Sequence, residues 1–148
     1  MPRSLLLRMM IGLTGAWLGV LLCIALLAAP AAFAVLDRVM AASVVGLLFE
    51  REAALSLALC IFLLVCLRRL CETELCSGLQ SLATDARVWA VLGVMLCTVV
   101  GYYALHPMME TAQAKQGAWS FRALHAASVG FFGLKALLLA FLGWRLTK

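Results

Sequence analysis

Apolar residues dominate four stretches of the chain, and short polar connections separate them. The stretches cover residues 9–36, 50–70, 88–105 and 121–144. An α-helix needs about 20 apolar residues to cross the ~30 Å hydrocarbon core of a bilayer. Spanning segments must be helices or closed barrels, because lipid offers no hydrogen bonds to a free backbone. The pattern predicts an all-α membrane protein, a single domain of four transmembrane helices in an antiparallel bundle.

The first stretch follows Arg3 and Arg8 and ends in the small residues of AAPAAFA, as a secretory signal would. Its apolar run far exceeds the ~7–15 residues of a signal core, so we expect an uncleaved helix. Gly15 and Gly19 have the small-xxx-small spacing that lets membrane helices approach closely. Pro30 is expected to kink or end the outer part of this helix.

Charged residues interrupt the next part of the pattern at Asp37-Arg38 and again at Glu50–Glu52. One helix through both would be about 50 Å long, well beyond the thickness of the hydrocarbon core. We therefore predict a short interfacial helix over residues 37–49 and a separate second span over 50–70. The charged ends of that span are expected to reach toward the headgroups.

The polar connection over residues 71–87 contains two of the six cysteines, Cys71 and Cys76. No short-range CxxC pair occurs in the chain, so we expect no disulfide framework. The roles of Cys71 and Cys76 stay open. In the third span, a repeat every four residues predicts a close-packing face formed by Gly93, Cys97 and Gly101, and Pro107 is expected to close the helix.

The fourth stretch carries a lysine, Lys135, far from either end. A charge at the bilayer centre costs roughly 2.5 kcal/mol or more, so it marks a functional hypothesis. At 100° per residue, His125, Ser128 and Lys135 share one face, which is expected to look into the bundle. Candidate partners for Lys135 are backbone carbonyls near Gly130 and Gly133, the hydroxyls of Thr14 or Thr98, and the carboxylates of Glu50 or Glu52.

The two histidines, His106 and His125, stand where the third span ends and the fourth begins, so both are expected at one face of the membrane. Imidazole with thioether suits copper, and two imidazoles suit haem iron. The alternative is that both histidines are structural and hydrogen-bond the intervening loop. The binding hypothesis assigns metal ligation to His106, His125, Met108 and Met109, and ligand binding to His106, His125, Ser128 and Lys135.

Composition narrows the class of protein further. Of 148 residues, 66% are hydrophobic and 13% charged, against ~50% and ~25% in soluble proteins. The net charge of +5 is spread over short connections, and no basic tract indicates nucleic acid as a partner. The sequence contains no paired intramembrane carboxylates, Gly-rich phosphate loop or metalloprotease motif, so we expect no enzyme.

Positive charges favour one orientation in the membrane. Seven cations lie on the side of the termini and four on the other. The positive-inside rule then predicts a multi-pass protein of the bacterial inner membrane with both termini in the cytoplasm. Both histidines would lie at the outer face. The cations on the side of the termini are Arg3, Arg8, Arg68, Arg69, Arg87, Arg145 and Lys148, and those opposite are Arg38, Arg51, Lys115 and Arg122.

Two stretches carry a family resemblance. The segment APAAFAVLDRVMAASVVGLLFEREAALSLALCIFLL, and LHPMMETAQ followed by FRALHAASV, resemble a bacterial membrane family catalogued as domain of unknown function 4149, related to transmembrane protein 205. The resemblance covers about residues 12–144. It implies a four-helix membrane protein of this length and supplies no activity.

Two functions therefore stay open. The first is a membrane protein that binds or handles a metal ion, haem or another small ligand at the outer histidine cluster. The second is an accessory or structural subunit of a larger membrane complex, or a homo-oligomer, with no chemistry of its own. Beyond the lipid bilayer, the sequence does not name a partner.

Overall fold

The computed structural model describes residues 3–72, 85–113 and 119–148. In this part the chain is helical and forms no strand. Its elements are α1 (Arg3–Cys23), η1 (Ile24–Ala28), α2 (Ala29–Val35), α3 (Arg38–Glu72), α5 (Ala86–Thr98), η2 (Val99–Ala104), α6 (Leu105–Gln113) and α7 (Phe121–Leu146), where η denotes a π-helical turn. Joined through the π turns, these elements give four helices that are long and apolar enough to cross a membrane. The predicted all-α fold is confirmed, and the protein is a multi-pass membrane protein.

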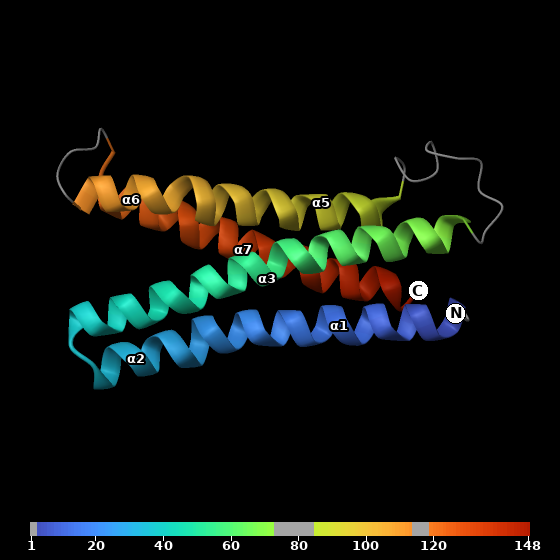
Figure 1. Ribbon diagram of the computed structural model, residues 1–148, viewed down its shortest axis with the longest axis horizontal. Helices are drawn as coiled ribbons and strands as arrows, with labels where there is room; N and C mark the ends of the chain where they lie inside the picture. The colour runs from blue at the N-terminus through green and yellow to red at the C-terminus, as the bar shows by residue number, and fades with distance from the viewer. Residues whose placement is uncertain (1–2, 73–84, 114–118) are drawn as a thin grey trace.

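The four long helices lie side by side with alternating direction, and the N- and C-termini lie at the same end of the bundle (Figure 1). The helix α7 packs against α5 and α1, while α3 packs against α5. Apolar side chains from all four helices form one core, which includes Leu21, Leu63, Val94 and Leu139. The third and fourth long helices make an antiparallel pair, as expected for a short connection.

Two glycines explain how closely α5 and η2 approach α7. A Cβ atom added at Gly101 would lie 2.9 Å from the Cβ of Phe131, and one added at Gly93 would lie 2.9 Å from Leu138 Cδ1. Cys97, between them, is 5% exposed. The close-packing face predicted from the four-residue repeat is confirmed.

The helices continue through Pro30 and Pro107, so Pro107 does not end the third helix and Pro30 does not end the first. A proline ring clashes with the carbonyl four residues earlier and removes one hydrogen bond. For Pro30 and Pro107, those carbonyls belong to Leu26 and Tyr103, which lie in the π turns η1 and η2. The wider turns accommodate the missing bonds, as π-bulges do elsewhere. The third helix therefore runs on through α6 to Gln113.

The predicted boundary between an interfacial helix over 37–49 and a second span is wrong, because α3 is one continuous helix. The segment contains no proline and a single glycine, Gly46, so nothing in it breaks a helix. The Glu50–Glu52 charges do not end the span, since Glu52 is buried in the bundle. At about 50 Å, α3 is longer than the hydrocarbon core, so it tilts or extends beyond it.

The start of α5 is fixed by a charged cap. The side chain of Asp85 accepts a hydrogen bond from the backbone N–H of Arg87 at 2.8 Å and forms an ion pair with the Arg87 guanidinium at 2.8 Å. Burial raises the pKa of Asp85, but the hydrogen bonds and charge of Arg87 outweigh it and hold the pKa below its usual value. The cap is therefore ionised at neutral pH. Most of the predicted 71–87 connection, with Cys76, and also Lys115 lie outside the described residues.

Candidate functional site

Lys135 of α7 forms an ion pair with Glu52 of α3 inside the bundle. Its Nζ atom lies 2.9 Å from each carboxylate oxygen of Glu52. Lys135 is 3% exposed and Glu52 is 5% exposed. The prediction that Lys135 faces the bundle is confirmed, and among the candidate partners the Glu52 carboxylate binds it.

Two further donors complete the carboxylate's environment. The indole Nε1 of Trp17, on α1, donates to Glu52 Oε1 at 3.4 Å, and the Ser56 hydroxyl donates to the same oxygen. The Lys135 ammonium also lies 6.0 Å from the centroid of the Trp17 ring. In the described part of the chain, no buried side-chain nitrogen or oxygen lacks a hydrogen-bond partner. The two charges thus neutralise each other and are hydrogen-bonded, as buried charges must be.

Thiols extend this polar centre to the third long helix, through α5. Cys60 of α3 and Cys97 of α5 are buried and lie within electrostatic range of Lys135. The Cys60 thiol donates to the Val91 carbonyl of α5 at 3.8 Å. The hydroxyl candidates take no part, since Thr14 and Thr98 donate to backbone carbonyls of their own helices. We call Trp17, Glu52, Ser56, Cys60, Cys97 and Lys135 the polar core.

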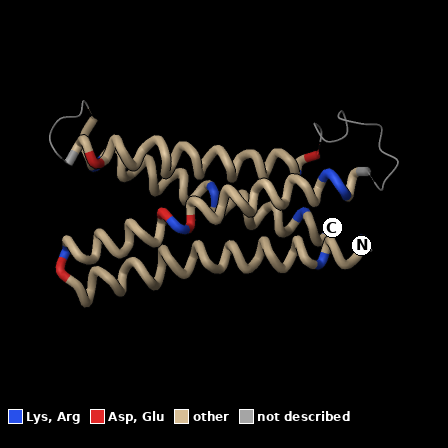
Figure 2. Tube along the Cα trace, viewed as in Figure 1, with Lys and Arg blue, Asp and Glu red and all other residues tan. Residues whose placement is uncertain are grey.

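The ion pair lies far from both ends of the bundle. Along α7, Lys135 is about 20 Å from Arg122 and about 15 Å from Arg145. Charged residues gather at the two ends of the molecule and in one group near its middle (Figure 2). The Glu52–Lys135 pair thus sits at the depth where ionisable residues are most costly and most often functional.

Reasoning from the sequence missed Trp17 and Ser56, and misplaced Glu52 at the end of a span. Glu52 does not reach toward the headgroups, because Lys135 neutralises it inside the bundle. Ser56 follows Glu52 by one helical turn, so its place on the same face was visible in the spacing. Trp17 shares a buried face with Thr14 and Leu21, and no local signal indicated its partner.

The histidines each contact residues of their own helix. His106 Nδ1 lies 3.5 Å from Glu110 Oε1, and its ring centroid is 5.0 Å from that of Tyr102. The His125 ring stacks on Phe121 at 5.8 Å. No hydrogen bond, ion pair or ring contact joins the two histidines in the described residues. Binding of a metal ion, haem or another ligand by the outer histidine cluster stays a prediction.

The remaining predicted site residues lie apart from the ion pair. The Ser128 hydroxyl donates to the Gly101 carbonyl at 3.1 Å, which ties α7 to η2. Met108 is exposed and Met109 half-buried. His125 is exposed, because it lies about 70° from the centre of the buried face of α7. Within the described ranges, no three His, Cys, Asp or Glu residues are grouped to hold a metal ion.

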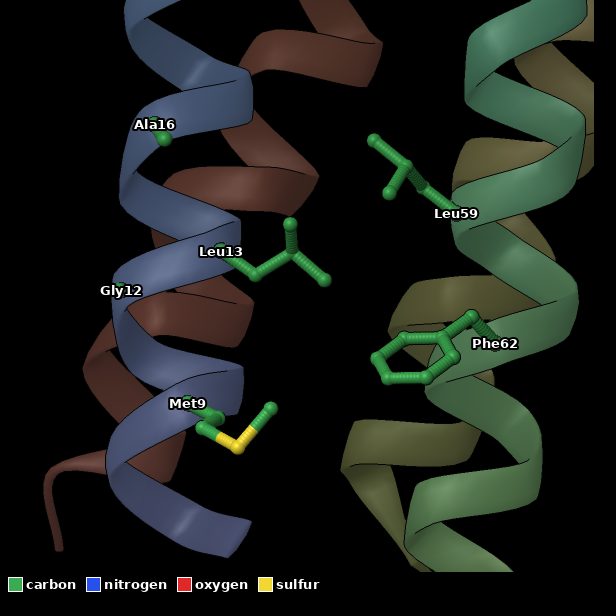
Figure 3. A pocket seen from close by; sticks show the side chains of 6 residues that line it. All are labelled: Met9, Gly12, Leu13, Ala16, Leu59 and Phe62. Atoms are coloured by element: carbon green, nitrogen blue, oxygen red, sulfur yellow. The ribbon is translucent and has the colours of Figure 1, made fainter. Parts of the chain in front are cut away.

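An apolar groove of about 570 Å³ runs between α1 and α3. Side chains of both helices project toward the space between them (Figure 3). The Trp17–Glu52 contact lies beyond one end of the groove, one turn from Leu13 on α1. A Cβ atom added at Gly12, Gly15 or Gly19 would meet no atom within 4 Å. The groove is lined by Met9, Gly12, Leu13, Ala16, Leu59 and Phe62.

The fold and the polar core show which class of protein this is: a small multi-pass helical membrane protein with an ion pair buried in its core. The chain belongs to the family described as domain of unknown function (DUF4149), whose sequence model matches residues 12–118. The match includes Trp17 and Glu52 and ends before Lys135. No curated protein and no solved structure matches the chain. The family resemblance inferred from the sequence is confirmed, and the family's description names no activity.

Proposed function

We propose that the protein is an accessory membrane subunit, a rigid four-helix unit that assembles with other membrane proteins and carries out no chemistry of its own. The observation that carries this proposal is the unpacked small-residue face of α1 beside the apolar groove. Membrane helices associate through close packing at small residues. Gly93 and Gly101 already receive neighbours from α7, whereas Gly12, Gly15 and Gly19 receive none.

The polar core supports the same proposal, because it fixes α1 relative to α3. The Trp17–Glu52 hydrogen bond joins these two helices at one end of the groove. Breaking a buried ion pair is costly, whereas replacing it with apolar residues is often neutral, so such a pair serves geometry more than stability. A satisfied buried network also rigidifies the core around it.

A partner helix in the groove can be tested with a matched pair of glycine variants. We expect Gly12→Leu to fill the groove and abolish co-purification of larger membrane subunits in mild detergent. Gly130→Leu is the control, since Gly130 on α7 has equally open surroundings but lies outside the groove. Identical co-purified subunits with wild type, Gly12→Leu and Gly130→Leu would contradict the proposal.

The alternative function, binding of copper, haem or another ligand at His106 and His125, is tested by the same preparation. Its optical spectrum and metal content would reveal a bound group directly. Stoichiometric metal or haem that is lost in both His106→Ala and His125→Ala would favour this function over the accessory one. A colourless, metal-free chain that co-purifies with larger subunits would favour the accessory role.

We also propose that the membrane is the bacterial inner membrane and that both termini are cytoplasmic, on the basis of the seven-to-four distribution of cations. In cells lacking the native thiols, Lys115→Cys is expected to react with a membrane-impermeant maleimide. Ser4→Cys, near the N-terminus, is expected to be protected until the cells are opened. The opposite labelling pattern would reverse the orientation.

A further inference from the structure

The helix α3 has a second regular face, opposite to the one that it buries. The residues of this face follow one another at alternating spacings of four and three, and all of them are exposed. The exposed fractions of Leu47, Ile61 and Val65 are 52%, 60% and 53%. This alternation is the heptad pattern by which two helices pack along a seam. The buried face carries Glu52, Ser56 and Cys60 instead. We call the seam of Leu47, Arg51, Ala54, Ala58, Ile61 and Val65 the outer seam.

Two charges lie on or beside the outer seam at the middle of the bundle. Arg51 occupies the seam, and Glu50 precedes it; both are exposed. They adjoin Glu52, whose pair with Lys135 lies midway along α7. In the described residues, neither Glu50 nor Arg51 forms an ion pair. Charges exposed to lipid at this depth are costly, so they call for an opposite charge from outside this chain.

The two charges are complementary to a second copy of the same surface. In the heptad of the outer seam, Arg51 takes an a position and Glu50 the preceding g position. When two identical helices pack in parallel, g of one copy flanks a of the other. A two-fold axis normal to the membrane then produces the same Glu50–Arg51 contact twice. Ala54 and Ala58, one and two turns further along, have the small-xxx-small spacing that allows the backbones to approach.

We propose that the outer seam of α3 is the interface of a parallel homodimer, in which Glu50 of each copy pairs with Arg51 of the other. The dimer neutralises both intramembrane charges without help from another protein. It leaves the glycine face of α1 available, so it goes beyond the accessory role and does not depend on it. A failure of the groove variants to release a partner would leave the dimer untouched, and the reverse also holds.

Charge reversal in the full-length protein tests this interface. Glu50→Arg gives each copy two arginines, and Arg51→Glu gives each copy two glutamates, so each variant should repel itself. We expect wild type to dimerise in liposomes, as measured by single-molecule photobleaching over a dilution series, and each variant alone to dimerise at least tenfold more weakly. Mixing the two variants should restore dimers, because the mixed pair is again complementary. The double variant E50R/R51E should also self-associate.

The mixture provides its own folding control, since restored dimers require both variants to be folded. Arg122→Glu, which reverses an exposed charge on α7, is the matched control and should dimerise like wild type. The proposal is overturned if wild type stays monomeric throughout the dilution series, or if either single reversal dimerises like wild type. It is equally overturned if neither the mixture nor the double variant associates.

Discussion

Lys135→Leu is expected to destabilise the protein by about 3–5 kcal/mol, because it breaks a buried ion pair. The substitution leaves the Glu52 carboxylate buried at 5% exposure without its cation. Trp17 and Ser56 would still donate to it, but neither carries a charge. The free energy of unfolding, measured by titrating detergent micelles with a denaturing surfactant, provides the test.

The double variant Glu52→Leu/Lys135→Leu is the control for this prediction. The double variant leaves no unpaired charge in the bundle, because the Glu52 carboxylate is removed together with Lys135. It is therefore expected to recover most of the lost stability. Trp17→Phe removes one hydrogen bond to the charged Glu52 and part of a buried ring, and should cost about 1.5–3 kcal/mol. A free energy of unfolding of Lys135→Leu equal to that of wild type, or a double variant as unstable as the single one, would contradict the role assigned to the pair.

Gly101→Ala is expected to cost about 1–3 kcal/mol, as overpacking a tight core does. The added methyl would lie 2.9 Å from the Cβ of Phe131, an atom that cannot move without the backbone of α7. Gly93→Ala should cost less, because the atom in its way is the end of the flexible Leu138 side chain. The same unfolding titration measures both.

Gly19→Ala is the matched control, since an added Cβ there meets nothing within 4 Å. It is expected to be neutral or slightly stabilising, because alanine favours a helix more than glycine does. Equal losses of stability in Gly19→Ala and Gly101→Ala would contradict this account, in which Gly101 is required for the close contact between η2 and α7.

The fold was largely predictable from the sequence, because a bilayer restricts apolar segments to spanning helices. The inward position of Lys135 followed from the cost of charge in lipid. The depth of Glu52 did not follow, since its charge was read as the end of a span. Its partner lies 83 residues away in the sequence, and helical periodicity carries no information on which helices become neighbours.

Predictions from local sequence patterns were also wrong about one helix end and about the position of one site residue. Pro107 was expected to end a helix, but η2 accommodates it one turn earlier. His125 was placed with Lys135 on a shared face, yet it lies at the edge of that face and stacks on Phe121. Such details depend on packing between neighbouring helices, which overrides local sequence preference.

The central claim is that an ion pair between Glu52 and Lys135 joins α3 to α7 inside the membrane. Solid-state NMR of the protein in lipid bilayers, with ¹⁵N in the lysine side chains and ¹³C in the glutamate carboxyl groups, measures this contact directly. We expect a strong dipolar coupling between one lysine Nζ and one glutamate carboxyl carbon, consistent with Nζ at 2.9 Å from both carboxylate oxygens. The coupling should disappear in Lys135→Leu. Its absence in wild type, or its persistence in Lys135→Leu, would contradict the claim.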